Sequence, residues 1–114
     1  MSDCLFCRII AGEIQANVVY RDQEITAFRD INPQAPTHIL LVPNEHVAST
    51  SEMGEEHGPL MGRIVLRAAA LARQEGLGAG GYRLVANTGP DAGQSVGHFH
   101  LHLLGGRRMG WPPG

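Results

Sequence analysis

The seven-residue stretch HFHLHLL at positions 98–104 is the feature that most restricts how this chain can fold. Histidine alternates with an apolar residue over its first six positions. Successive side chains of a β-strand point to opposite faces of the sheet, so the alternation predicts a strand with three histidines on one face. Phe99, Leu101 and Leu103 would then point into the core.

The remaining pattern predicts an α+β domain over 1–114 with a mostly antiparallel sheet of five strands. Apolar residues at helical spacing predict one long helix over 59–75, with Gly76 as its C-terminal stop. A short helix is expected over 4–11, with Asp3 as its N-cap. The strands are expected at 18–21, 24–28, 38–42, 82–87 and 98–104, the first two as a hairpin with its turn at 22–23.

Composition and charge give no support for a nucleic-acid or membrane partner. The formal net charge is -2 at pH 7, without a clustered basic face. No apolar run approaches the roughly 20 residues that cross a bilayer. The first ten residues, MSDCLFCRII, carry an acid where a signal peptide has a positive charge. We therefore expect a cytoplasmic protein.

Three histidines within five residues allow three interpretations. The strand could simply be polar and face solvent. It could hold a metal, since imidazole is a common zinc ligand, but the first and third histidines lie about 13 Å apart along a strand, so at most two could share one ion. It could also do chemistry, because a neutral imidazole is a nucleophile at pH 7 and a protonated one neutralises phosphate.

The two cysteines of the chain, Cys4 and Cys7, form a C-x-x-C. In a reducing compartment this spacing indicates a metal half-site or a redox pair rather than a disulfide framework. The βαβ pattern of thioredoxin-like proteins does not accompany it, which favours the metal half-site.

Three separated segments resemble the histidine triad family of nucleotide hydrolases and transferases. Residues 98–104 match its signature, His-φ-His-φ-His-φ-φ, at all seven positions. FRDINPQAPTHILLVP, NTGPDAGQSVGHFHLHLLGG and the closing WPPG are similar to the branch of nucleoside phosphoramidases, and the likeness runs from Cys4 to Gly114. The resemblance implies hydrolysis of a purine nucleoside 5'-phosphoramidate to AMP or GMP and an amine, without a catalytic metal.

The resemblance also implies a role for each matching residue. His100 would be the nucleophile that forms a nucleotidyl-histidine, with its other ring nitrogen donating to a main-chain carbonyl of the same strand. His102 would contact the phosphate, and His38 would brace the histidines unless it is merely structural. Asp30 would hold the ribose hydroxyls. The other nucleotide contacts would be Asn87, Gly93, Gln94 and Ser95 near the ribose and phosphate, and Leu5, Phe6, Ile9, Phe28 and Ile31 around the base; by their pattern alone, these five apolar residues would be core.

Some members of the family, mainly bacterial, carry a structural zinc whose ligands match Cys4, Cys7, His46 and His98. The alternative is two thiols on a short helix with His46 on the surface. The resemblance also implies a homodimer with joined sheets, in which the tail 105–114 places Trp111 at the partner's substrate pocket. The alternative is a disordered tail.

Three other functions stay open from the sequence. A dinucleoside polyphosphate hydrolase of the same family is one, although that branch usually lacks the WPPG ending. A nucleotide-binding regulatory or scaffold protein with incidental catalysis is another. A small zinc module is the third, and it would unfold on chelation and have no affinity for nucleotides.

Overall fold

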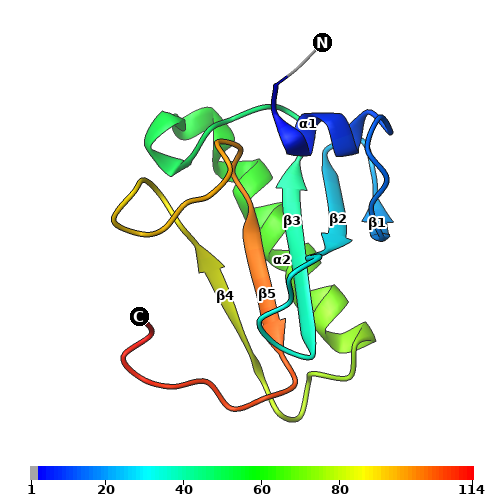
Figure 1. Cartoon of the computed structure of the whole chain (residues 1–114), viewed down its shortest axis with the longest axis vertical. Coiled ribbons are helices and arrows are strands. Elements are labelled where there is room, and N and C mark those ends of the chain that lie inside the picture. Colours follow the sequence, from blue (N-terminus) through cyan, green and yellow to red (C-terminus); the bar gives the residue numbers. More distant parts are fainter. Residues whose placement is uncertain (1–2) are drawn as a thin grey trace.

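A five-stranded antiparallel sheet is the framework of the computed structural model, which describes residues 3–114 (Figure 1). The strand order is β1-β2-β3-β5-β4, and all neighbouring strands are antiparallel. This confirms the predicted α+β class with one long and one short helix. The elements are α1 (Leu5–Ile10), β1 (Val18–Arg21), β2 (Ile25–Arg29), β3 (Thr37–Pro43), the 3-10 helices η1 (Thr50–Glu52) and η2 (Glu55–His57), α2 (Gly58–Gln74), β4 (Tyr82–Ala86) and β5 (Leu101–Gly105).

The central strand β3 is buried on both faces. Ile39 and Leu41 belong to a core shared with α2, whereas Leu40 and Val42 pack with Phe6 of α1 on the opposite face. A strand covered on both sides needs a continuous apolar run rather than alternation, which explains the sequence HILLV. The sheet therefore separates a larger core under α2 from a smaller one under α1.

Helix α2 ends as its sequence predicts. Gly76 has a φ of +77°, a conformation that glycine adopts without strain. Its N–H donates to the Arg73 carbonyl at 3.1 Å, and Leu77 N–H donates to the Ala72 carbonyl at 2.9 Å, which is a Schellman motif. Within residues 3–114, no helix has the length and apolar character needed to cross a membrane.

The N-cap of α1 is Cys4 rather than the predicted Asp3. The helix begins at Leu5, and the Cys4 sulfur accepts the Cys7 N–H at 3.4 Å. The sulfur thereby takes the position that a carboxylate oxygen of an aspartate cap would occupy. The capping interaction also holds Cys4 beside Cys7 at the start of the helix.

Strand β5 begins at Leu101, three residues later than predicted. Phe99 N–H donates to the Val47 carbonyl at 2.7 Å instead of pairing with β3, and the His98 ring bonds the Pro43 carbonyl. These two bonds pull residues 98–100 out of the sheet ladder. The alternation persists nevertheless, since Phe99 and Leu101 both lie in the core beneath α2, as does Leu103.

Candidate active site

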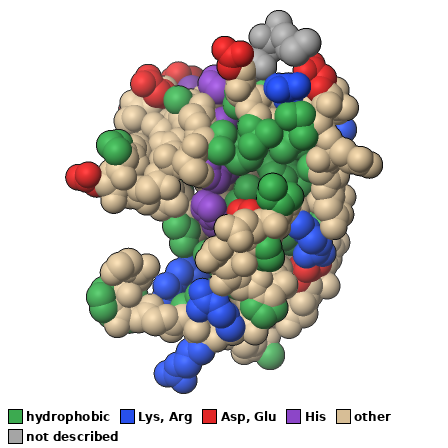
Figure 2. All heavy atoms as spheres, viewed as in Figure 1, with side chains coloured by type: hydrophobic (Ala, Val, Ile, Leu, Met, Phe, Trp, Pro, Cys, Tyr) green, Lys and Arg blue, Asp and Glu red, His purple; other side chains and the backbone are tan. Residues whose placement is uncertain are grey.

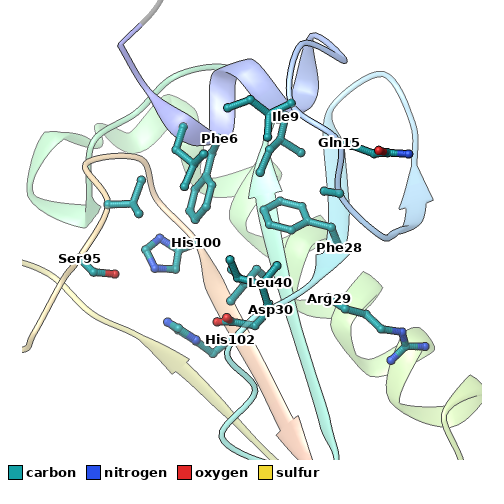
Figure 3. A pocket seen from close by; sticks show the side chains of 15 residues that line it. Phe6, Ile9, Gln15, Phe28, Arg29, Asp30, Leu40, Ser95, His100 and His102 are labelled. Atoms are coloured by element: carbon teal, nitrogen blue, oxygen red, sulfur yellow. The ribbon is translucent and has the colours of Figure 1, made fainter.

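A pocket opens on the side of the sheet that carries α1. Figure 2 shows it as a hollow of hydrophobic side chains beside a column of histidines. In Figure 3 an aromatic wall of Phe6 and Phe28 faces a polar end with His100, His102 and Asp30. The pocket is lined by Leu5, Phe6, Ile9, Ile14, Gln15, Ala16, Phe28, Arg29, Asp30, Ile31, Leu40, Ser95, Val96, His100 and His102.

The apolar wall is formed partly by core residues and partly by exposed ones. Phe6, Ile9 and Phe28 are buried and belong to the smaller core, yet each also lines the pocket. Leu5 is 43% exposed and Ile31 is 97% exposed, so these two are not core residues. All five apolar residues predicted around the base therefore line one pocket.

His100 lies at the junction of the apolar wall and the polar end. Its Nδ1 is 2.8 Å from the carbonyl oxygen of His98, so Nδ1 carries the proton and donates. The predicted main-chain acceptor thus exists two residues earlier in the chain. The Phe6 ring contacts the imidazole edge-on, with centroids 5.0 Å apart. Neutral His100 then has an unprotonated Nε2, the nitrogen that can attack an electrophile.

A chain of hydrogen bonds fixes the proton on His102. The Gln34 N–H donates to Nδ1 of His38 at 3.0 Å, so the proton of neutral His38 sits on Nε2. That Nε2 is 2.9 Å from Nδ1 of His102 and 3.5 Å from Oδ2 of Asp30. With Nδ1 of His102 accepting, its proton sits on Nε2. This Nε2 is buried and has no hydrogen-bond partner within the described chain. Buried donors are rarely left unpaired, so this N–H marks a position where a ligand or a water would be expected.

Burial keeps this histidine pair neutral. Desolvation, with a smaller effect of the neighbouring His100 and His38, lowers the pKa of His102 to about 4 against the opposing charge of Asp30. Burial also lowers the pKa of His38, with Asp30 opposing. At pH 7 both rings are therefore neutral, and the proton positions derived above apply.

The loop before the histidines is held by its own hydrogen bonds. Gly93 N–H donates to the Pro90 carbonyl and Gln94 N–H to the Gly89 carbonyl. The Gln94 side chain donates to two more main-chain carbonyls, those of residues 48 and 96. Of the predicted loop contacts, Ser95 lines the pocket. Asn87 is half-buried just after β4, and neither it nor Gly93 or Gln94 is among the lining residues.

The sequence interpretation missed Arg29, Leu40, Val96 and the segment 14–16, which complete the lining. Leu40 could have been found, because it is two residues from His38 on β3 and therefore shares its face. It also pairs directly with His102 in the sheet. The segment 14–16 has no comparable signal, since it is an irregular connection between α1 and β1.

The four predicted zinc ligands come together beside this pocket. Nδ1 of His98 is 3.3 Å from the Cys4 sulfur, 3.5 Å from the Cys7 sulfur and 3.1 Å from Nδ1 of His46. The Cys7 sulfur is 3.3 Å from Nδ1 of His46, and all four ligand atoms lie within 4.8 Å of one another. Ligands of a tetrahedral zinc are separated by about 3.3–3.8 Å, given its bond lengths, so this donor set fits zinc.

The orientation of His98 also suits a metal ligand. Its Nε2 lies 2.8 Å from the Pro43 carbonyl oxygen, which places the ring proton on Nε2. Nδ1 is left with a lone pair directed at the two sulfurs. A ligand histidine commonly has its second nitrogen fixed in this way.

Trp111 lies in the C-terminal segment, away from the pocket of its own chain. It is 84% exposed and is absent from the pocket lining. The segment is anchored just before it, because the Arg83 guanidinium donates to the Gly110 carbonyl at 2.8 Å. Figure 1 shows the C-terminus beyond the edge strand β4.

Comparison with known proteins assigns the class. The family model described as HIT domain matches residues 11–109. The chain is 48% identical to the purine nucleoside phosphoramidase of Escherichia coli K12, over 95% of this chain and 91% of that one. It is 50% identical to the 14 kDa zinc-binding protein of Zea mays, over 99% and 89% respectively. The crystal structure of a HIT family hydrolase from Legionella pneumophila superposes with a TM-score of 0.97 at 54% identity, covering 98% of this chain and all of the other. The chain belongs to the HIT domain family.

Proposed function

We propose that this protein hydrolyses purine nucleoside 5'-phosphoramidates to a nucleoside monophosphate and an amine. The observation that carries the proposal is the arrangement of His100 and His102 at the polar end of the pocket. Their centroids lie 4.9 Å apart, one ring with an unprotonated Nε2 and the other with an unpartnered Nε2–H. A nucleophile beside a hydrogen-bond donor is what attack on a phosphoryl group requires.

In the proposed reaction, His100 Nε2 attacks the α-phosphorus, the P–N bond breaks, and the amine takes up a proton as it leaves. The product is a nucleotidyl-histidine, which water then cleaves to the monophosphate and the original imidazole. His102 Nε2–H donates to a phosphoryl oxygen as negative charge grows there. Ser95, at the rim of the same end, supplies a further hydroxyl donor.

The apolar wall would receive the base. The rings of Phe6 and Phe28 meet edge to face, with centroids 5.3 Å apart, and Leu40 and Ile9 complete the surface. Such a slot selects a flat bicyclic ring by size. Asp30 sits between this wall and the histidines, where its carboxylate can accept from the ribose hydroxyls. Asn87, Gly93 and Gln94 are proposed to support the ribose and phosphate only after the loop adjusts around the ligand.

We further propose that Cys4, Cys7, His46 and His98 bind a structural zinc. Two thiolates and two imidazoles supply all four ligands of a closed tetrahedral site, which leaves no position for substrate. The ion would tie the start of α1 to the segment that carries the nucleophile. Thiolate ligands persist in a reducing compartment, which is consistent with a cytoplasmic protein.

The exposed apolar side chains support a homodimer. Val65 on α2 is 46% exposed, and Tyr82 on the edge strand β4 is 40% exposed. A second copy that pairs along β4 would cover these side chains and the strand edge together. Trp111, anchored beside β4 through Arg83, would then lie within reach of the partner.

The test is steady-state hydrolysis of a fluorogenic adenosine phosphoramidate by the wild type and by His100→Ala, with a dinucleoside polyphosphate assayed in parallel. We expect rapid release of the amine by the wild type only, and slow or absent cleavage of the polyphosphate. Faster cleavage of the polyphosphate would instead support the dinucleoside hydrolase. Binding of AMP without any turnover would support a nucleotide-binding scaffold.

A further inference from the structure

The C-terminal segment contacts the active-site loop that joins β2 to β3. Gly106, immediately after β5, has a φ of +92°, and a Cβ built on it would lie 2.9 Å from Cβ of Pro36. Arg107 follows, and its Nε donates to the Gln34 carbonyl at 2.9 Å. The loop and the beginning of the tail are therefore packed together at two adjacent points.

Gln34 is the residue that begins the hydrogen-bond chain to His102. Its N–H donates to His38, and its carbonyl accepts from Arg107, so the two bonds hold the main chain of this residue from opposite sides. His38 pairs with Leu104 in the sheet, and His102 is its diagonal neighbour on β5. A shift of Gln34 would thus act first on His38 and then on His102.

The hydrogen bond from Arg107 is the one that fixes the Gln34 carbonyl. Gln34 follows Pro33 and lies in an irregular loop, so no ladder hydrogen bond holds its carbonyl. A guanidinium donor makes a stronger bond to such a carbonyl than water does, and it has a fixed direction. Arg107 is itself steadied by a second bond from its Nη1 to the Arg108 carbonyl at 3.2 Å.

We propose that Arg107 is a positioning residue for the hydrolase. By holding the Gln34 carbonyl it keeps the Gln34 N–H on Nδ1 of His38, and so keeps the proton of His102 on the nitrogen that faces the phosphate. This role rests on the proposed function of His102 as the phosphate donor. Arg107 itself does not line the pocket.

If Arg107 is a positioning residue, its loss should slow the chemical step without weakening the binding of base and ribose, and kinetics can separate these two effects. Loss of the Arg107 bond would weaken the Gln34 N–H bond to Nδ1 of His38 and so allow both neutral rings to change tautomer by proton exchange with solvent. His38 would then carry its proton on Nδ1, and His102 would carry its proton on Nδ1 and donate it to Nε2 of His38. A fraction of molecules would then present a bare Nε2 to the phosphate, where a donor is needed. Binding of the base and ribose would be unaffected, because Phe6, Phe28 and Asp30 make no contact with Arg107.

The experiment compares Arg107→Met with Arg107→Lys and with the control Arg108→Met. Arg108 carries the same charge one residue further on, and its side chain makes no hydrogen bond or ion pair within the described chain. We measure the single-turnover rate with adenosine phosphoramidate, the Kd for adenosine, the Tm, and the ring ¹⁵N shifts of His38 and His102.

For Arg107→Met we expect a rate lower by about tenfold or more, the size expected when one hydrogen bond to a charged group is lost. The Kd for adenosine, which has no phosphate, should stay within twofold of the wild type. The ¹⁵N shifts should show part of the His102 proton on Nδ1. Arg107→Lys should recover part of both effects, and Arg108→Met should match the wild type. Unchanged ¹⁵N shifts in a folded Arg107→Met protein would overturn the proposal.

The two proposals fail in different ways. If the wild type shows no turnover, the proposed function is wrong, but the ¹⁵N shifts still report whether Arg107 sets the proton on His102. If turnover is rapid and Arg107→Met is indistinguishable from Arg108→Met in rate and shifts, the phosphoramidase stands and the positioning role is wrong.

Discussion

The carbonyl oxygen of His98 lies 2.8 Å from Nδ1 of His100, while the ring of His98 belongs to the Cys/His cluster. One residue thus joins the proposed zinc site to the proposed nucleophile. Its main chain sets the proton on His100, and its side chain is positioned by Cys4, Cys7 and His46. Stability of the cluster and competence of the nucleophile should therefore change together.

Removal of zinc should lower both stability and activity. Loss of an ion present at about 1,000 times its Kd removes roughly 4 kcal/mol of stability, equivalent to a fall in Tm of about 10 °C or more for a chain of this size. We expect the same fall for Cys7→Ser and after treatment with a chelator, together with a lower kcat. Calorimetry and zinc analysis on one sample measure this. A chelated protein with unchanged Tm and full activity would contradict a structural zinc.

The neutral state of His102 should make stability depend on pH. Its pKa is about 4 in the folded chain against 6.5 ordinarily, so the unfolded chain binds more protons between these values. The contribution is therefore complete above pH 6.5 and is lost as the pH falls toward 4, by about 2–3 kcal/mol. The free energy of unfolding, measured with urea, should differ less between pH 7 and pH 4.5 for His102→Asn than for the wild type. Equal differences would refute the assignment.

Ile31 should contribute to binding and not to folding. The side chain is 97% exposed and lines the pocket. Ile31→Ala should leave the free energy of unfolding within about 0.5 kcal/mol of the wild type, as surface substitutions usually do. It should raise the KM for the phosphoramidate about threefold, because it removes apolar surface from the base slot. The matched control is Ile39→Ala in the core, which should cost about 2–5 kcal/mol of stability.

Arg83→Met should release the C-terminal segment. Trp111 is the one tryptophan in the chain, so its fluorescence reports the segment directly. Without the bond from Arg83 to the Gly110 carbonyl, the segment should move more freely. The fluorescence anisotropy of Trp111 should therefore be lower in Arg83→Met than in the wild type at the same protein concentration. Arg73→Met, a loss of charge at the end of α2, should leave the anisotropy unchanged. An equal fall in both variants would mean that Arg83 does not anchor the segment.

Periodicity predicted most of the fold. HILLV and HFHLHLL specify their strands because apolar residues must be buried in a fixed register. The predicted boundaries were wrong where a side chain forms a hydrogen bond with a main-chain group at the end of an element. Cys4 displaced Asp3 as the cap of α1, and the ring of His98 took the Pro43 carbonyl, which shortened β5. Neither competition is visible in a hydrophobic pattern.

The parts of the candidate site that could be predicted are those whose residue types have a distinctive chemistry. The histidines and cysteines were identified from their spacing and from the family resemblance, and the structure brings them into two adjacent groups. The connections between them were not predictable. Gln34 acts through its main-chain N–H and carbonyl, which every residue has, and the Arg107 guanidinium binds that carbonyl, so no residue pattern in the sequence indicates the connection.

The most direct test of the central claim is rapid-quench mass spectrometry of the intact protein during turnover of adenosine phosphoramidate. We predict a transient mass gain equal to one adenylyl group, located on His100 and absent from His100→Ala, that forms and decays within the turnover time. Amine release without any covalent adduct, or a His100→Ala protein that keeps its activity, would contradict a nucleophilic His100.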